Sequence, residues 1–303
     1  MHWLHRLKSL VTDPPPEIAF EVSARGIASS PARHPRLAWT PLPEGALEVS
    51  PLENNLRDPE AFAAAVRAAA GNGDARPRRR RAALILPDYC ARVTVLDFDS
   101  FPAESAEQLQ LVRFRIRRVV PFDIENAVVA CYPQPRHDAS GRIDVVAAVV
   151  NMDVASHYET PFRAAGFHCG FVTLSALAAL SLPPAEELSL PGPRVAAKLS
   201  GDTLAVSLVE DARLRLYRCV QLGEDNLDEA TSVLATTLAY SEDELGRRAA
   251  AIHFCGLSRE QAHWIARWKD EFGLPVTGVR GRLGEPSPCN AGLLGYLESL
   301  ESA

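Results

Sequence analysis

The chain has 303 residues, a length that corresponds to about two domains. Hydrophobic residues make up 47% and charged residues 23%, which excludes collagen-like, disordered and small disulfide-scaffold proteins. With 32 basic and 38 acidic residues the net charge is −6, the opposite sign to that of a general nucleic-acid binder. Composition therefore predicts a globular protein with no nucleic-acid partner.

No stretch of the sequence predicts a membrane span or a secretory leader. The longest apolar run, 145–150, is far shorter than the roughly 20 residues that cross a bilayer. The first residues, MHWLHRLKSLV, lack both a long apolar core and a small-residue cleavage site. We therefore expect a cytoplasmic protein.

The six cysteines are scattered and form no CxxC pair, so we interpret them as reduced thiols. The alternative is a metal site built from His253, Cys255, His263 and Cys289. His253 and Cys255 would share one face of a strand, but the other spacings match no zinc pattern. The sequence therefore predicts no metal site.

The first segment, residues 1–16, is basic and amphipathic. Trp3, Leu4 and Leu7 follow a helical spacing, and the triple proline at 14–16 ends the predicted helix. Such a helix either lies on an anionic membrane surface or docks on its own domain or a partner. Both interpretations stay open at this point.

The next part of the chain alternates predicted strands and helices up to residue 180. A helix begins at Asp58-Pro59 and ends at Gly71, because it has a capping residue, a first-turn proline and a terminal glycine. A second helix is predicted over 105–120, and a third begins at Asp153 and ends at Gly166. Strands are predicted at 18–22, 27–30, 37–42, 82–86, 93–98, 128–132, 143–150 and 167–173, and a short helix at 174–180. The near-continuous apolar run of 143–150 predicts a fully buried strand.

Two clusters of arginines interrupt this part of the chain. The loop at 71–81 holds five arginines and is either a patch for phosphate or lipid headgroups or a solvated loop, which we favour. Four more lie on the predicted helix 105–120, at positions 113, 115, 117 and 118. We expect these four to be mainly solvated, with a partner-facing surface as the alternative.

A proline-rich and acidic stretch at 182–193 is the best candidate for a linker. Strands are predicted after it at 195–199, 203–209, 214–220, 251–255 and 276–279, and helices at 225–248, 259–272 and 290–300. Trp264 and Trp268 are one helical turn apart and predict a core-facing helix.

An internal repeat links the two parts of the chain. The segments IAFEVSARGIASS at 18–30 and VAAKLSGDTLAVS at 195–207 align without gaps at an offset of 177 residues. Each reads as strand, turn of small residues and strand, and each opens a meander of three strands that leads to a helix. The repeat predicts two similar α/β domains that face each other across a cleft.

The order of motifs resembles the PilM family of type IV pilus assembly proteins, an FtsA-like branch of the actin/Hsp70/sugar-kinase superfamily. The two repeat segments match its two phosphate turns, and IHFCGLS matches its adenosine strand and glycine turn. Between them, LILPDYCARVTVLDFDSFP, LVRFRIRRVVPFDIENAVVACY, DVVAAVV, RAAGF and VTLSALAAL match the inserted subdomain and the end of the first half. The resemblance covers nearly all of the chain from about residue 17.

The resemblance implies an α/β, actin-like (ribonuclease H-like) two-domain fold. The first half, 17–185, carries an inserted subdomain at about 90–165. A linker at 186–193 leads to the second half, 194–303, which is reduced because the stretch 226–250 has room for one long helix only. A short second half argues against autonomous filaments.

The resemblance also implies a nucleotide site, whose motifs are substituted here. The first turn supplies Glu21, Ser23 and Gly26 in place of the family's Asp-x-Gly turn. The second turn has Lys198 and Ser200 at those positions. The remaining residues assigned to the nucleotide are Gly201, Asp202, Thr203, Cys255 and Gly256. Because a lysine replaces one acid that would hold hydrated magnesium, we expect weak or lost binding of ATP and Mg²⁺ and no catalytic residue.

By resemblance, the protein is a cytoplasmic scaffold, peripheral to the inner membrane, that binds the N-terminal peptide of a PilN-like membrane protein. It would also contact the pilus motor ATPases. The peptide would lie in a groove between the first half and the inserted subdomain, with a rim at Pro87, Tyr89, Pro121 and Phe122. Alternatives are an active ATPase or kinase of the same fold, or a scaffold of a type II secretion or cell-division complex.

Overall fold

The computed structural model describes residues 16–71, 80–135, 142–184, 190–224 and 226–301. The amphipathic segment 1–15, most of the arginine loop and residues 185–189 of the predicted linker lie outside the described residues. In chain order the elements are β1 (Ile18–Ser23), β2 (Gly26–Pro31), β3 (Ala38–Pro41), α2 (Pro59–Ala69), β4 (Arg80–Leu86), η1 (Asp88–Cys90), β5 (Ala91–Phe98), α3 (Ser105–Ile116), η2 (Ile124–Asn126), β6 (Ala127–Pro135), β7 (Ile143–Asn151), α4 (Met152–Ala164), β8 (Phe167–Leu174), α5 (Ser175–Ala179), β9 (Arg194–Ser200), β10 (Thr203–Glu210), β11 (Arg213–Gln221), α6 (Asn226–Leu245), β12 (Ala251–Cys255), η3 (Glu260–Ala262), α7 (His263–Phe272), β13 (Val276–Gly278) and α8 (Ala291–Glu301).

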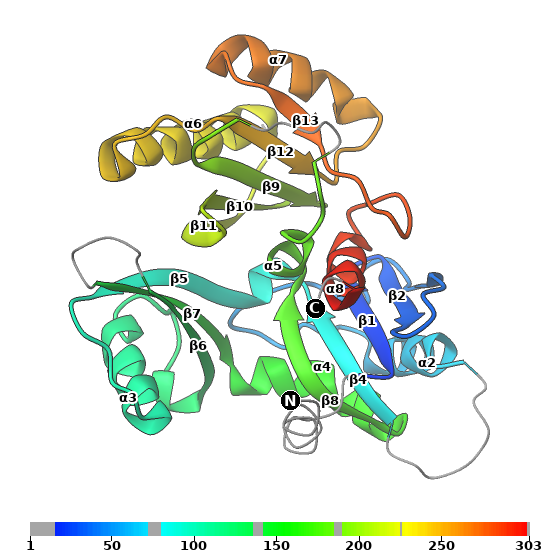
Figure 1. Cartoon of the computed structure of the whole chain (residues 1–303). Coiled ribbons are helices and arrows are strands. Elements are labelled where there is room, and N and C mark those ends of the chain that lie inside the picture. Colours follow the sequence, from blue (N-terminus) through cyan, green and yellow to red (C-terminus); the bar gives the residue numbers. More distant parts are fainter. Residues whose placement is uncertain (1–15, 72–79, 136–141, 185–189, 225, 302–303) are drawn as a thin grey trace, which may run out of the picture.

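Two five-stranded sheets are built on the same plan. The first has the order β3-β2-β1-β4-β8, and the second has the order β11-β10-β9-β12-β13. In each, an antiparallel meander is extended by two parallel strands. The two sheets lie in two lobes of the molecule, with α5 between them (Figure 1). The predicted duplication is therefore present in the fold.

The hairpins that open the two sheets correspond residue by residue. Ser23 pairs with Gly26 across the first turn, and Ser200 pairs with Thr203 across the second. The repeat offset of 177 places Glu21 of β1 and Lys198 of β9 at equivalent positions, and both side chains are buried. The same structural position therefore carries opposite charges in the two halves.

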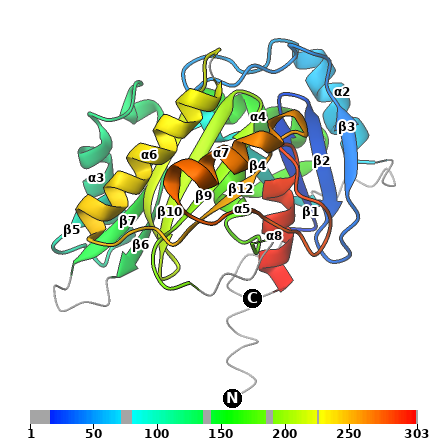
Figure 2. The ribbon, with the colours of Figure 1, turned by 90° about the horizontal axis from the view of Figure 1, so that it is seen from above.

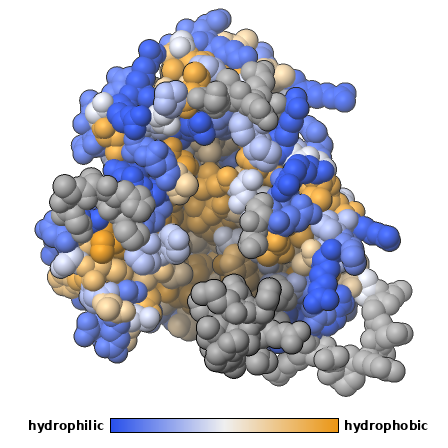
Figure 3. All heavy atoms as spheres, viewed as in Figure 1, coloured by the Kyte–Doolittle hydropathy of each residue, from blue (hydrophilic) through white to orange (hydrophobic). Residues whose placement is uncertain are grey.

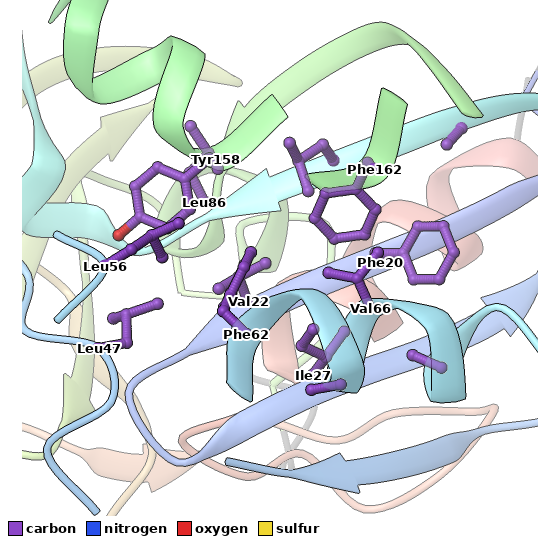
Figure 4. Packing of buried hydrophobic residues seen from close by; sticks show 14 of the residues in the cluster. Phe20, Val22, Ile27, Leu47, Leu56, Phe62, Val66, Leu86, Tyr158 and Phe162 are labelled. Carbon is purple, nitrogen blue, oxygen red and sulfur yellow. The ribbon is translucent and has the colours of Figure 1, made fainter. Parts of the chain in front are cut away.

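The core of the first half lies between its sheet and the helices α2 and α4. Phe20 of β1 packs against Phe162 of α4, with 4.9 Å between ring centroids, and Phe62 of α2 packs edge-on against the same ring. Figure 4 shows these rings among aliphatic side chains from β1, β2 and β4. Apolar residues from the strands and from one face of each helix make this interior.

The second sheet carries α6 and α7 on its outer face, side by side in Figure 2. Trp264 and Trp268 of α7 are buried, which confirms the predicted core-facing helix. The Trp268 indole N–H donates to the Thr231 hydroxyl of α6 over 2.8 Å, so the buried ring has its polar atom satisfied. Among the described residues between β11 and β12, α6 is the one helix, as the short stretch predicts.

The inserted subdomain is a three-stranded antiparallel sheet, β5-β7-β6, with α3 on one face. Its other face contacts β11 of the second half. The side-chain amide of Gln134 donates to the Leu214 carbonyl over 3.0 Å and accepts from the Leu214 N–H over 2.9 Å. Asp144 and Arg215 form a largely buried ion pair of 3.0 Å beside it. The subdomain therefore bridges the two halves.

The last helix, α8, packs on the sheet of the first half, although the sequence-based boundary places it in the second half. Leu293 and Leu297 of α8 lie in one apolar cluster with Ala19 of β1 and Ile85 of β4. A Cβ at Gly295 would lie 2.2 Å from the Ala178 carbonyl oxygen of α5, so the two helices approach closely. The segment before α8 therefore crosses from the second half to the first.

Three local expectations differ from the structure. Helix α3 ends at Ile116 rather than residue 120, because the residues before Pro121 form a turn in which the Val119 N–H bonds to the Ile116 carbonyl. Strand β7 is only partly buried on the face away from α3. The side chain of Arg113 is half-buried and donates to the carbonyls of Ile124 and Ala127, whereas the other three arginines of this set are exposed as expected.

Candidate functional site between the two halves

A cavity of about 330 Å³ lies between the halves, where the β1–β2 and β9–β10 turns face each other. It is also lined by the segment after β4 and by the chain that leads into α8. Eight of the ten residues that the resemblance assigns to a nucleotide line this cavity: Glu21, Ser23, Lys198, Ser200, Gly201, Asp202, Thr203 and Gly256. The two hairpins thus meet at one place, as the repeat predicts.

Glu21 sits at the floor of the cavity and is only 1% exposed. One carboxylate oxygen accepts a hydrogen bond from the Ser175 hydroxyl, and the other accepts from the Leu293 N–H at 2.7 Å. Burial raises the pKa of Glu21, and the charge of Lys198 and the hydrogen bond from Ser175 oppose that shift. Both oxygens of this acid are therefore engaged by the first half and by the N-terminal turn of α8.

Lys198 forms a buried ion pair with Asp88, 3.2 Å from Nζ to Oδ2, with both side chains 5% exposed or less. The other Asp88 oxygen accepts from the Ala176 N–H at 2.6 Å, at the start of α5. Burial lowers the pKa of Lys198, but the charges of Asp88 and Glu21 outweigh it and raise the pKa above its ordinary value. The lysine is therefore a charged group inside the cleft.

The serine hydroxyls of the two turns form hydrogen bonds to other groups of the protein. The Ser200 hydroxyl accepts from the Lys198 ammonium at 2.5 Å and donates to the Pro288 carbonyl at 3.0 Å. The Ser23 hydroxyl donates to the Gly26 carbonyl at 2.9 Å and closes its own hairpin. Neither hydroxyl is turned toward a ligand in this arrangement.

Two glycines of the predicted nucleotide motifs are explained by close backbone packing. Gly256 has φ 92°, and a Cβ there would lie 2.0 Å from the Leu199 carbonyl oxygen of β9. At Gly26 a Cβ would lie 2.4 Å from the Thr40 carbonyl oxygen of β3. Cys255 is buried, and burial raises the pKa of its thiol to about 12. Gly26 and Cys255 do not line the cavity.

These residues do not fit a hydrated magnesium ion held between two acids. The Lys198 ammonium pairs with Asp88 and hydrogen-bonds Ser200, so a second cation beside it would be repelled at short range in a poorly hydrated place. The oxygens of Glu21 already accept two hydrogen bonds. The cleft is therefore built around a cation that belongs to the chain.

Asp88, Ser175 and Leu293 were not predicted as site residues. A signal for Asp88 was present, because it directly follows the buried parallel strand β4 and so lies at the carboxyl edge of the sheet, beside the end of β1. No pattern pointed to Leu293, which reaches Glu21 through its backbone N–H across 272 positions in sequence.

The four residues predicted for the peptide rim fall in two different surroundings. Pro87 and Tyr89 line the cavity between the halves. Pro121 and Phe122 lie beyond the end of α3, where Phe122 packs against the core of the inserted subdomain. Arg92 covers the Tyr89 ring at 4.8 Å. These four residues do not form one rim.

A separate apolar hollow lies between the first half and the inserted subdomain. Strands β6 and β8 are edge strands of their sheets, and α4 contacts both. Large apolar side chains of these elements are exposed: Val128 and Tyr132 on β6, Met152 on α4 and Val172 on β8. Figure 3 shows apolar side chains gathered in a hollow at the centre of this face. These exposed side chains lie between the two parts of the chain that the resemblance assigns to the peptide groove, and they differ from the four residues predicted for its rim.

In the described part of the chain, no group of three His, Cys, Asp or Glu side chains is placed to hold a metal ion. All six cysteines are free thiols. None of the helices in the described ranges combines the length and apolar character needed to cross a membrane.

Comparison with known proteins gives the fold. No protein-family model and no curated protein sequence matches the chain. Among solved structures, a chain of the PilM–PilN type IV pilus biogenesis complex is 17% identical with a TM-score of 0.72, over 94% of this chain and 98% of that chain. The cytoplasmic domain of EpsL, an inner-membrane component of the type II secretion system of Vibrio cholerae, is 14% identical with a TM-score of 0.55, over 94% and 95%.

A protein of unknown function with an actin-like ATPase fold, from Bacteroides thetaiotaomicron, is 10% identical with a TM-score of 0.51, over 86% of this chain and 89% of that chain. The chain therefore has the α/β, actin-like two-domain fold, with a subdomain inserted in the first half and a reduced second half.

Proposed function

We propose that this protein is a non-catalytic scaffold that captures an extended N-terminal peptide of a PilN-like membrane protein. It would act on the cytoplasmic side of the inner membrane in type IV pilus assembly, next to the motor ATPases, with weak or lost binding of ATP and Mg²⁺. Two lines support this proposal: the ordered PilM-like motifs, and the likeness over 94% of the chain to a protein solved in a PilM–PilN complex.

The observation that carries the proposal is the set of exposed apolar side chains on and between the edge strands β6 and β8. The edge strand β8 has no proline, and its Val172 side chain is 43% exposed. Proteins usually protect such an edge, because its free N–H and C=O groups can pair with another strand. An extended peptide that adds to the edge would satisfy these groups, while Val128, Tyr132 and Met152 would contact its apolar side chains.

The test is binding of the N-terminal peptide of a PilN-like protein encoded beside this gene, measured by calorimetry with the full chain. Val172→Lys places a charge in the groove, and we expect affinity to fall at least about tenfold. Phe114→Ser is the matched control, because Phe114 is 76% exposed on α3, whose other side covers the subdomain core.

We expect Phe114→Ser to bind the peptide as the wild type does. Absence of wild-type binding at high micromolar peptide would contradict the proposal. Equal losses of affinity in Val172→Lys and Phe114→Ser would show that the peptide does not bind between β6 and β8.

A second candidate is a scaffold of a type II secretion complex, which the EpsL likeness favours. The same assay separates the two. Tight binding of a peptide from a secretion-system partner, with no binding of the PilN-like peptide, would favour this second role.

A further inference from the structure

The cleft holds three buried ionisable side chains that belong to the chain. Glu21 and Lys198 occupy equivalent positions of the duplicated hairpins, and Asp88 follows the strand next to β1. Each is at most 5% exposed. A buried charge is costly unless it is paired, so this arrangement persists only because its members satisfy one another.

Every oxygen of the two acids has a partner from the protein. Glu21 accepts from Ser175 and from the Leu293 N–H of α8. Asp88 accepts from the Ala176 N–H of α5 and from Lys198. The two N–H donors lie in the first turns of helices, where the helix dipole also favours an anion. Lys198 therefore neutralises one of the two acids, Asp88, and neutral donors of the protein satisfy the other.

The lysine contacts join the two halves of the molecule. Lys198 belongs to the second sheet and Asp88 to the first half, and Ser200 extends the chain of hydrogen bonds to Pro288, in the segment that crosses back. We infer that Lys198 is a built-in cation that holds the halves in one closed arrangement, at the place where the fold would otherwise take a metal-bound nucleotide.

A tethered cation differs from a bound one in two physical respects. Its local concentration is fixed by the chain, so closure does not depend on the supply of ligand. Its pair is buried, so dissolved salt screens it much less than a surface pair. The cleft would thus stay closed in all cellular conditions, and the inference stands whether or not the groove binds a PilN-like peptide.

The test compares four full-length proteins: wild type, Lys198→Met, the double variant Lys198→Met/Asp88→Asn, and Lys269→Met. The double variant removes both members of the pair, so that Asp88 is not left as an unpaired charge, while Glu21 keeps its hydrogen bonds from Ser175 and Leu293. Lys269→Met makes the same chemical change on the exposed face of α7. Thermal unfolding and small-angle X-ray scattering are recorded with and without millimolar Mg-ATP.

We expect the wild type and Lys269→Met to keep one melting temperature and one radius of gyration with and without Mg-ATP. Lys198→Met should melt about 5 °C lower or more, because Asp88 loses its partner. The double variant should recover part of that loss, yet show a larger radius of gyration than the wild type, because the halves are no longer tied.

Two results would overturn the inference. One is a wild type that Mg-ATP stabilises or compacts, because a ligand that binds only the folded state must raise its stability. The other is a double variant as compact as the wild type. If the double variant does not fold, the wild type still tests the inference. An increase in its melting temperature or a decrease in its radius of gyration with Mg-ATP would overturn it.

Discussion

Several residues of the cleft match the predicted nucleotide motifs, but the contacts that they make are to other residues of the protein. Gly256 is the clearest case. Its position matches the family's adenosine motif, but the structure requires glycine there because the Leu199 carbonyl of β9 lies against it. Backbone packing alone therefore accounts for glycine at this position.

Gly256→Ala should destabilise the protein by about 3 kcal/mol, since it combines an unfavourable φ with a clash against backbone. Gly273 also has positive φ, at 60°, but only the end of the Arg248 side chain lies near it, so Gly273→Ala should cost about 1 kcal/mol. Urea unfolding of both variants measures the difference. Equal losses of unfolding free energy in the two variants would show that the close contact with the Leu199 carbonyl adds nothing to the cost of the substitution at Gly256.

Among the elements, the inserted sheet β5-β7-β6 belongs to the first half and also contacts β11 of the second. It covers α3 on one side and reaches β11 of the second half on the other. Gln134 forms two hydrogen bonds to the backbone of Leu214, in the manner of a strand neighbour. This pairing fixes the subdomain against the second half through one side chain.

Gln134→Ala should therefore leave the Leu214 N–H and C=O without partners in a buried place, which costs about 1–3 kcal/mol. Hydrogen exchange followed by mass spectrometry should show faster exchange in β11 and unchanged exchange in β1. Gln108→Ala is the control, because Gln108 bonds only to the Pro102 carbonyl within the subdomain. Faster exchange in β1 as well would instead indicate a global loss of stability.

Most elements could be predicted from the sequence, because strands such as β1 and β9 repeat at a fixed offset and helix α2 carries its own cap, proline and terminal glycine. The end of α3 could not, since a turn closed by the hydrogen bond from the Val119 N–H to the Ile116 carbonyl replaces the last helical turn before Pro121. The ion pair of Lys198 was also missed. The internal repeat identifies Lys198 as an unusual residue at its position. Its contact with Asp88 could not be predicted, because the two residues are 110 positions apart and meet only where the two sheets pack together.

At the scale of the whole molecule, the last helix ties the two halves together. The chain leaves the second sheet after β13, passes the cleft at Pro288 and ends with α8 on the first sheet. Helix α8 also supplies the Leu293 N–H to Glu21. The stability of the first half therefore depends on residues that lie more than 260 positions later in sequence.

Leu297→Ala should create a cavity between α8 and the first sheet and cost about 2–5 kcal/mol. Hydrogen exchange should then accelerate in β1 and β4 rather than in β9 and β12. Leu234→Ala in α6 is the matched control, since Leu234 belongs to the core of the second half and should show the reverse. Identical exchange patterns in the two variants would contradict separate packing of the halves.

The opposite charges at the duplicated position also decide which halves can face each other. Two copies of the first half would bring a pair of Glu21 carboxylates together, and two copies of the second half would bring together a pair of Lys198 ammonium groups. Either pairing would bury like charges, which costs several kcal/mol. The acid in one half and the lysine in the other therefore favour the pairing of unlike halves.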